Sequence, residues 1–333
     1  MCIRDRDMNK LILVTNDDSI HAKGIMELVT VAIQFGGYEI KDLVECSKKA
    51  EKLGYKRFWV SEHHNHPSII GTAPEILMAA IATHTKTIRI GSAGIMLPHY
   101  SPFKVAEQFR VLEAIAPNRI DLGLGRAPGS DGRTALALNP NSRNDSEQFP
   151  GHVRDLMAWV SNETLLEGHP FRHLVAQPTS DTSPEIWMLG TSNYGAQLAA
   201  YLGIPYCFAH FITDGSGIKE AIKTYKSEFR PNSTLKEPLV NVCLWALTAK
   251  THEEAKYLFS SRAAWKIGRN FGHLGPITDP DNALNIIHEN NYLWISYAED
   301  RGNSRTSTSI ARAKLDKKEL NFKNIFQANP PID

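Results

Sequence analysis

An alternation of short β-prone runs and helical segments is the feature that most constrains how this chain can fold. Apolar, β-prone runs predict strands at residues 58–60, 88–92, 120–124, 186–189, 205–209 and 239–247. Helical patterns occur beside or between them, at residues 39–53, 73–83, 103–115, 193–201, 214–229 and 252–267. A β-then-α rhythm repeated over about 250 residues is typical of a (β/α)8 barrel or a doubly wound sheet.

Composition narrows the class of protein. A chain of 333 residues with 42% hydrophobic and 22% charged residues can bury the core of one large α/β domain or two smaller ones. The formal net charge of +1 gives no electrostatic footprint for nucleic acid. No apolar run approaches the roughly 18 residues that span a membrane, and residues 1–7 are followed by too few apolar residues for a signal-peptide core. Four widely spaced cysteines without a Cys-x-x-Cys pair argue against a zinc site or a disulfide framework. We therefore expect a cytoplasmic protein with neither nucleic-acid nor membrane partners.

Two histidines follow directly on the predicted strand 58–60, in the sequence Glu62-His63-His64. Side chains at such a strand end project into the mouth of a barrel, where an imidazole can reach a ligand. Alternatively, both histidines are structural and bond to the backbone. A zinc site of His63, His64 and His66 is a third reading, but that spacing matches no usual ligand set.

Small residues end the next two strands. The run 91–94, Gly-Ser-Ala-Gly, would let a planar ring approach the backbone, or would serve only for tight packing of a buried strand. Gly123-x-Gly125-Arg126 is not a dinucleotide fingerprint, because the third glycine, Gly129, comes one residue too late.

The run Gly190-Thr191-Ser192-Asn193 joins the strand at 186–189 to a predicted helix. Hydroxyls and backbone N–H groups at a helix N-terminus favour an anion, although serine and threonine are also ordinary N-caps.

Three segments, 56–65, 88–98 and 119–129, together resemble the bacterial luciferase-like flavin-dependent monooxygenases. The resemblance extends over residues 37–285. It implies a (β/α)8 TIM barrel that uses reduced FMN and dioxygen to oxidise a small organic substrate, with a separate flavin reductase supplying the FMN. A homodimer is compatible with it. A deazaflavin (F420)-dependent oxidoreductase on the same fold is the nearest alternative.

The same resemblance implies roles for particular residues. His63 faces the flavin and aids proton transfer, whereas His64 is structural. The flavin packs against Ala93 and Gly94, whose peptide bond is the one that is often cis in this family. The phosphate is then bound by the remaining predicted residues: Arg126, Thr191, Ser192 and the backbone at Gly195.

The two ends of the chain depart from this family. Residues 9–25 resemble the N-terminus of survival-type (SurE) metal-dependent nucleotidases, with Asp17 and Asp18 as its metal-binding pair, but Ser19 replaces a glycine of that motif and its later ligands have no counterpart. We predict three parts: a foreign segment at 1–36, the barrel at 37–290 and a divergent tail at 291–333. The barrel is then incomplete at its first and last strands, with residues 11–15 filling the first position. A 5'-nucleotidase and an inactive chimera remain as alternative readings.

One stretch within the barrel, residues 129–151, is rich in Asn, Asp, Ser, Gly and Pro. This composition predicts an exposed loop, either a lid over the site or an insertion without a role.

Overall fold

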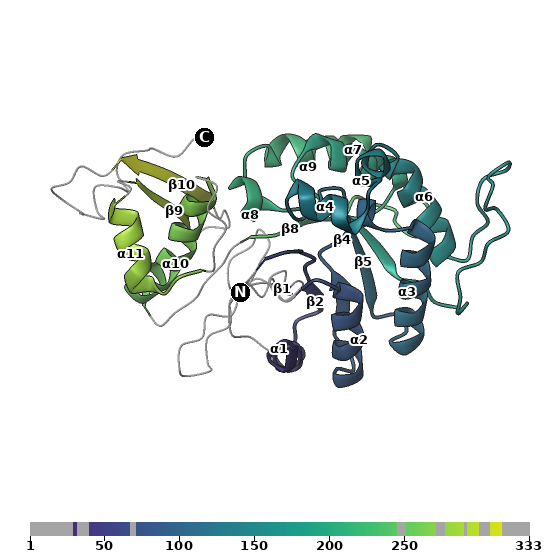
Figure 1. The fold of residues 1–333 in the computed structure, drawn as a ribbon, viewed down its shortest axis with the longest axis horizontal. Coiled ribbons are helices and arrows are strands. Elements are labelled where there is room, and N and C mark those ends of the chain that lie inside the picture. Colours follow the sequence, from purple (N-terminus) through teal and green to yellow (C-terminus); the bar gives the residue numbers. More distant parts are fainter. Residues whose placement is uncertain are drawn as a thin grey trace.

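A parallel sheet that curls into part of a barrel forms the centre of the molecule (Figure 1). The computed structural model describes residues 29–31, 40–66, 71–244, 251–270, 277–289, 292–299 and 307–314. The sheet runs in the order β1 (Val29–Val31), β2 (Arg57–Val60), β3 (Arg89–Ser92), β5 (Ile120–Gly125), β6 (Glu185–Gly190), β7 (Tyr206–Phe208) and β8 (Val240–Val242), and the short β4 (Ile95–Met96) also pairs with β5. Every pairing in this sheet is parallel.

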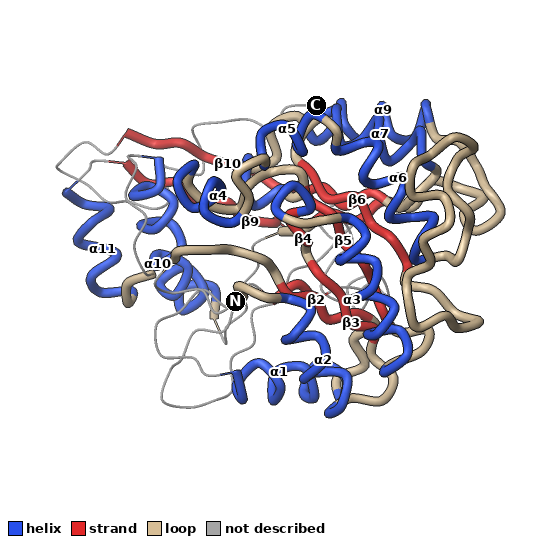
Figure 2. Tube along the Cα trace, turned by 45° about the vertical axis from the view of Figure 1, so that its right-hand side comes forward, coloured by secondary structure: helices blue, strands red, loops and turns tan. Residues whose placement is uncertain are grey.

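The described helices are α1 (Ile40–Lys52), α2 (Pro74–His84), α3 (Pro102–Ile115), α4 (Gly132–Leu138), α5 (Ser142–Glu147), α6 (Phe149–Val160), α7 (Asn193–Leu202), α8 (His210–Thr213), α9 (Ile218–Glu228), α10 (His252–Asn270) and α11 (Pro280–Glu289), with a 3-10 turn at Leu97–His99. Of these, α2, α3, α7 and α9 pack against the outer face of the sheet, whereas α10 and α11 pack against each other (Figure 2). Within the described residues, none of these helices has both the length and the apolarity needed to cross a membrane.

The predicted (β/α)8 architecture, incomplete at its end, is confirmed. After β8 the chain forms α10 and α11, and then β9 (Tyr292–Glu299) and β10 (Ser307–Lys314), which pair with each other in an antiparallel sheet. Among the described residues, no parallel strand follows β8 in the barrel sheet. The tail that we predicted at 291–333 therefore contains strands, although they do not extend the barrel.

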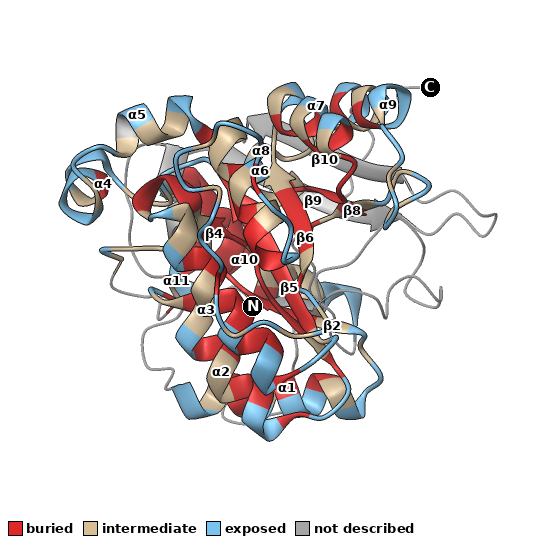
Figure 3. Cartoon of the chain, turned by 90° about the vertical axis from the view of Figure 1, so that its right-hand side faces the viewer, coloured by how far each residue is buried: buried red, intermediate tan, exposed pale blue. Residues whose placement is uncertain are grey.

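The strands are buried on both faces, as Figure 3 shows for β5 and β6. Every residue of β5 is buried. Alternate side chains point outward into a large core shared with the helices, which includes Phe58, Ile90 and Leu122. The inward side chains form a second cluster of Trp59, Trp187, Cys207 and Cys243. Burial on both faces explains why these strands read as dense apolar runs.

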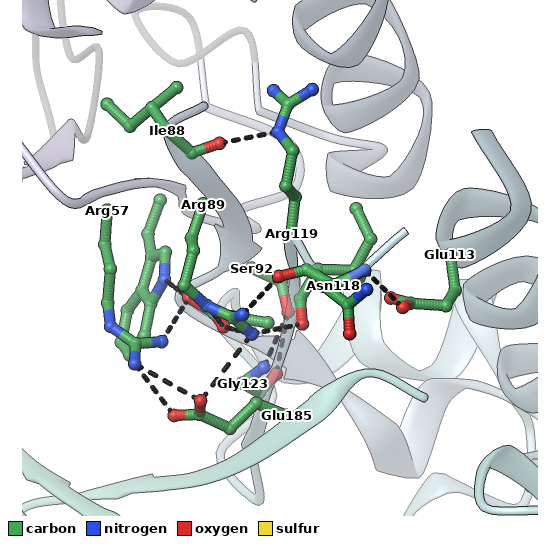
Figure 4. A network of polar contacts seen from close by, with 12 residues as sticks. Arg57, Ile88, Arg89, Ser92, Glu113, Asn118, Arg119, Gly123 and Glu185 are labelled. Atoms are coloured by element: carbon green, nitrogen blue, oxygen red, sulfur yellow. Dashed lines mark hydrogen bonds and ion pairs between the residues drawn. The ribbon is translucent and has the colours of Figure 1, made fainter. Parts of the chain in front are cut away.

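A charged cluster fills the barrel interior near the amino ends of the strands, where Arg57, Arg89 and Glu185 meet in Figure 4. The fully buried Asp121 joins them: its Oδ2 accepts from Arg57 Nη1 at 2.7 Å and from Trp59 Nε1 at 2.7 Å. Its Oδ1 accepts from Arg89 Nε at 2.8 Å. Glu185 Oε1 lies 3.0 Å from Arg57 Nη2. We call Arg57, Arg89, Asp121 and Glu185 the base cluster. Each of these charged side chains, from four different strands, forms an ion pair with an oppositely charged member of the cluster.

The prediction of an exposed loop over residues 129–151 was wrong in its secondary structure, because α4, α5 and the start of α6 lie there. One of its polar residues caps α4: the Asp131 side chain accepts from the backbone N–H groups of Arg133 and Thr134 at 2.9 and 3.1 Å. The side chain of Asn139 then donates to Pro98 O at 2.8 Å. Composition alone did not distinguish cap residues from loop residues.

The first-strand prediction was also wrong. The position beside β2 is taken by β1, Val29–Val31, rather than by residues 11–15, which lie outside the described residues. β1 thus falls within the segment predicted to be foreign. Asp17 and Asp18 of the nucleotidase-like motif also lie outside the described residues.

Candidate active site

The predicted site residues come together at the carboxyl edge of the sheet. β2, β3, β5 and β6 are neighbours in the sheet and all run the same way, so the segments that follow them emerge at one edge. The segment after β2 carries His63, that after β3 carries Ala93 and Gly94, and that after β5 carries Arg126. The turn after β6 carries Thr191 and Ser192.

Close backbone packing shapes the centre of this edge. The Ala93–Gly94 peptide bond is cis, at the position that the resemblance to the luciferase-like enzymes indicated. A Cβ atom added to Gly94 would lie 2.7 Å from Gly123 O, and one added to Gly123 would lie 2.1 Å from Ser92 O. The Ser92 hydroxyl donates to Gly123 O at 2.9 Å and accepts from Gly123 N at 3.0 Å (Figure 4). The glycines therefore let these two strand ends pack closely, and Ala93 beside them remains partly exposed.

Arg126 extends from the end of β5 toward the first turn of α7. Its guanidinium carbon lies 4.0 Å from the ring centroid of Tyr194. The side chain is exposed, and it forms no hydrogen bond or ion pair with any residue that the structure describes. Without such a bond to a described residue, the guanidinium retains its five N–H donors for an anion.

The N-terminus of α7 provides further donors next to Arg126. Ser192 is the N-cap residue, and its side chain forms no capping hydrogen bond within the described part of the chain. The backbone N–H groups at the start of a helix lack intrahelical partners and carry partial positive charge. Thr191 is half-buried, Ser192 is exposed and Gly195 is buried in the first turn. The structure thus brings Arg126, Thr191, Ser192 and Gly195 into one region, as predicted for a phosphate site.

His63 is held by two backbone carbonyls and stays partly exposed. Its backbone N–H donates to Gly71 O at 2.8 Å, and its Nδ1 lies 3.1 Å from Gly129 O. A carbonyl oxygen can only accept, so Nδ1 carries the hydrogen in this contact and Nε2 carries the lone pair. In the neutral form of the ring, Nε2 is then the nitrogen that accepts a proton.

Glu62 organises the other half of the motif, a role that sequence reasoning missed. This fully buried carboxylate accepts from His64 Nε2 at 2.7 Å, from the Tyr100 hydroxyl at 2.8 Å and from Met96 N at 2.9 Å. Burial and the charge of Glu62 raise the pKa of Tyr100 above its usual range, so the phenol remains a donor. His64 also packs edge-on against His99, with 5.8 Å between ring centres. No local spacing links residues 62, 96 and 100, because they meet only through the pairing of strands.

The segment around α4 is tied to this edge. The Asn65 amide donates to Asp131 Oδ2 at 3.4 Å and to Thr134 Oγ1 at 3.2 Å. His99 Nε2 bonds to Pro128 O at 2.8 Å. These contacts fasten the chain after β5 to the segment after β2, which carries His63, and to the 3-10 turn after β4.

Apolar residues line the barrel interior at the level below the site. Trp59 and Trp187 meet edge to face, with 5.2 Å between ring centres. Ala93, Leu189 and Phe211, all partly buried, pack against them and against the two buried cysteines. Burial raises the pKa of Cys207 well above its usual value, so this thiol stays neutral. Among the described residues, the side chains of this interior cluster therefore carry no charge.

Comparison with known proteins agrees with this geometry. The family model for luciferase-like monooxygenases matches residues 12–308. The chain is 44% identical over 219 residues to the uncharacterized protein YwcH of Bacillus subtilis, covering 66% of this chain and 65% of that protein. It is 39% identical over 238 residues to the luciferase-like monooxygenase of Escherichia coli, covering 71% of this chain and 69% of that protein. The match to YwcH thus spans somewhat less than two thirds of that relative.

Solved structures show the same fold. The crystal structure of apo-MsnO8 superposes with a TM-score of 0.68 at 34% sequence identity, covering 77% of each chain. More distant structures share the fold alone: the oxygenating constituent of 3,6-diketocamphane monooxygenase in complex with FMN has a TM-score of 0.57 at 20% identity. An F420-dependent secondary alcohol dehydrogenase has a TM-score of 0.54 at 17% identity. The chain belongs to the luciferase-like monooxygenase family.

Proposed function

We propose that this chain is a flavin-dependent monooxygenase that acts on paired donors and uses reduced FMN and dioxygen to oxidise a small organic substrate. The observation that carries the proposal is the meeting of Arg126 with the N-terminus of α7, at the same edge of the sheet as the partly exposed Ala93. The first part suits a phosphate, the resemblance to the family implies a ring at the second, and FMN contains both.

The donor set fits the phosphate of FMN. A phosphate dianion would meet the Arg126 guanidinium, the hydroxyls of Thr191 and Ser192 and the backbone N–H at Gly195. Charge-assisted hydrogen bonds of this kind are roughly twice as strong as neutral ones. The helix N-terminus adds a favourable dipole. The flavin ring would lie against Ala93 and Gly94, as the resemblance to the family implies.

Residues of the chain supply what the flavin chemistry needs from its surroundings. Reduced FMN, when bound, supplies the electrons that activate dioxygen. His63 holds a lone pair at Nε2 and can take up or return a proton at the mouth of the barrel. The interior formed by Trp59, Trp187 and Leu189 excludes water. A separate reductase would supply the reduced FMN.

Titration with FMN tests the cofactor assignment. Arg126→Ala should weaken binding by about 1.5 to 3 kcal/mol, the range for a hydrogen bond to a charged group. Arg133→Ala is the matched control, because Arg133 is an exposed arginine on the nearby α4. Equal affinities in wild type and Arg126→Ala would contradict the proposal.

The same titration with F420 addresses the deazaflavin alternative. Both cofactors carry a phosphate, so Arg126 alone does not distinguish them. Binding of F420 in preference to FMN would replace the monooxygenase proposal with a deazaflavin-dependent oxidoreductase.

A further inference from the structure

Tyr194 presents its ring to the Arg126 guanidinium at 4.0 Å. Tyr194 lies in the first turn of α7 and packs against the main hydrophobic core. Core packing fixes the ring, whereas the arginine itself is exposed. The better-ordered partner of this pair is therefore the tyrosine.

This stacking decides where the guanidinium lies. Within the described residues, no hydrogen bond or ion pair draws Arg126 elsewhere. An arginine side chain has many rotamers, and each one lost on binding an anion weakens the binding. A guanidinium that already lies against a ring in the free protein has lost most of these rotamers before the anion binds. Its N–H groups donate to no described residue, so they remain available to an anion.

We infer that Tyr194 is a positioning residue that holds Arg126 beside the N-terminus of α7, so that a phosphate meets a preorganised guanidinium. The inference rests on the proposed function, because it concerns the same phosphate. Tyr194 acts here through Arg126, so its effect should be confined to ligands that carry a phosphate.

FMN and riboflavin form the pair of probes that isolates this effect, because they differ only in the phosphate. Their affinities are measured by quenching of flavin fluorescence in wild type, Tyr194→Leu, Tyr194→Phe, Arg126→Ala and the Arg126→Ala/Tyr194→Leu double variant. Tyr194→Leu should weaken FMN binding about two- to fivefold, the value of an exposed cation–π contact, and leave riboflavin binding unchanged. Tyr194→Phe keeps the ring and should bind FMN like wild type. In the Arg126→Ala background, Tyr194→Leu should cause no further loss.

Three outcomes would overturn the inference. Tyr194→Leu could leave FMN affinity unchanged, or it could weaken the binding of FMN and riboflavin equally. It could also lower FMN affinity by the same factor in the Arg126→Ala background as in wild type. Each of these leaves the proposed function standing, provided that Arg126→Ala still loses FMN affinity. If Arg126→Ala binds FMN like wild type, the phosphate assignment and the inference both fail. Thermal melting of each variant checks that the helix remains folded.

Discussion

The two ends of the parallel sheet treat charged groups in opposite ways. At the amino end, Arg57, Arg89, Asp121 and Glu185 are mutually paired across four strands, and Asp121 is fully buried. At the carboxyl end, Arg126 is exposed and contacts a ring, and the N-terminus of α7 has no side-chain cap among the described residues. Charged side chains whose hydrogen bonds and ion pairs are all formed within the protein stabilise the fold. Donors that keep unused hydrogen-bonding capacity can bind a ligand.

The largest expected effect lies at the amino end. Asp121→Asn removes the charge that holds two guanidiniums and the Trp59 indole, and breaking a buried ion pair costs about 3–5 kcal/mol. Urea denaturation should show this loss, while FMN affinity per folded molecule stays near wild type. Lys48→Ala, which removes the exposed pair with Glu45, is the control and should change stability by about 0–1 kcal/mol. A loss of FMN affinity as large as the loss of stability would show that the two ends are coupled.

Adjacent histidines at the carboxyl end allow a sharper test. His63→Ala should slow the oxidation of reduced FMN by dioxygen about 100-fold, because a positioned acid or base is lost, with little change in melting temperature. His64→Ala should do the reverse: it removes a hydrogen bond to the buried Glu62 carboxylate and should destabilise the fold by about 1.5–3 kcal/mol. Stopped-flow absorbance and thermal melting separate the two effects. Wild-type oxidation kinetics in His63→Ala would exclude a role for it in the reaction.

Glu51 offers a smaller effect, dependent on pH, outside the site. Partial burial raises the pKa of Glu51, but backbone N–H groups at Ile88, Thr87 and Lys86 outweigh it and hold the pKa at about 2. A folded-state pKa below the unfolded value stabilises the protein above the unfolded pKa of 4.5, and this contribution is lost as the pH falls toward 2. The stability difference between wild type and Glu51→Gln should therefore be largest near neutral pH and shrink between these values. A difference that does not change from pH 7 to pH 3 would contradict this account.

Sequence reasoning located most strands and helices because each depends on local pattern. The strand predicted at 120–124 is β5, Ile120–Gly125, and the helix predicted at 103–115 is α3, Pro102–Ile115. The base cluster depends instead on strand order and register. Arg57 and Glu185 are separated by 128 positions in the chain, and only the parallel pairing of β2, β3, β5 and β6 brings them together.

The sequence predicted the residues that would contact a cofactor better than the residues that hold them in place. His63, Arg126 and Ser192 stand out because they follow strand-like runs directly. Tyr194 and Glu62 do not, because an aromatic residue in a helix and a glutamate in a motif usually have other roles. The helices α4 and α5 were missed because their capping residues have the composition of a loop.

Two glycines within the strands, Gly91 in β3 and Gly123 in β5, determine where this protein can be changed. A methyl group at Gly91 would lie 2.6 Å from the Trp59 indole, and one at Gly123 would lie 2.1 Å from Ser92 O. Mutational libraries directed at these positions should consist largely of unfolded proteins. Leu189 and Phe211 are partly buried side chains packed against the same apolar interior, so a change in their size acts first on side-chain packing. Attempts to alter which compounds the protein accepts should therefore begin at Leu189 and Phe211.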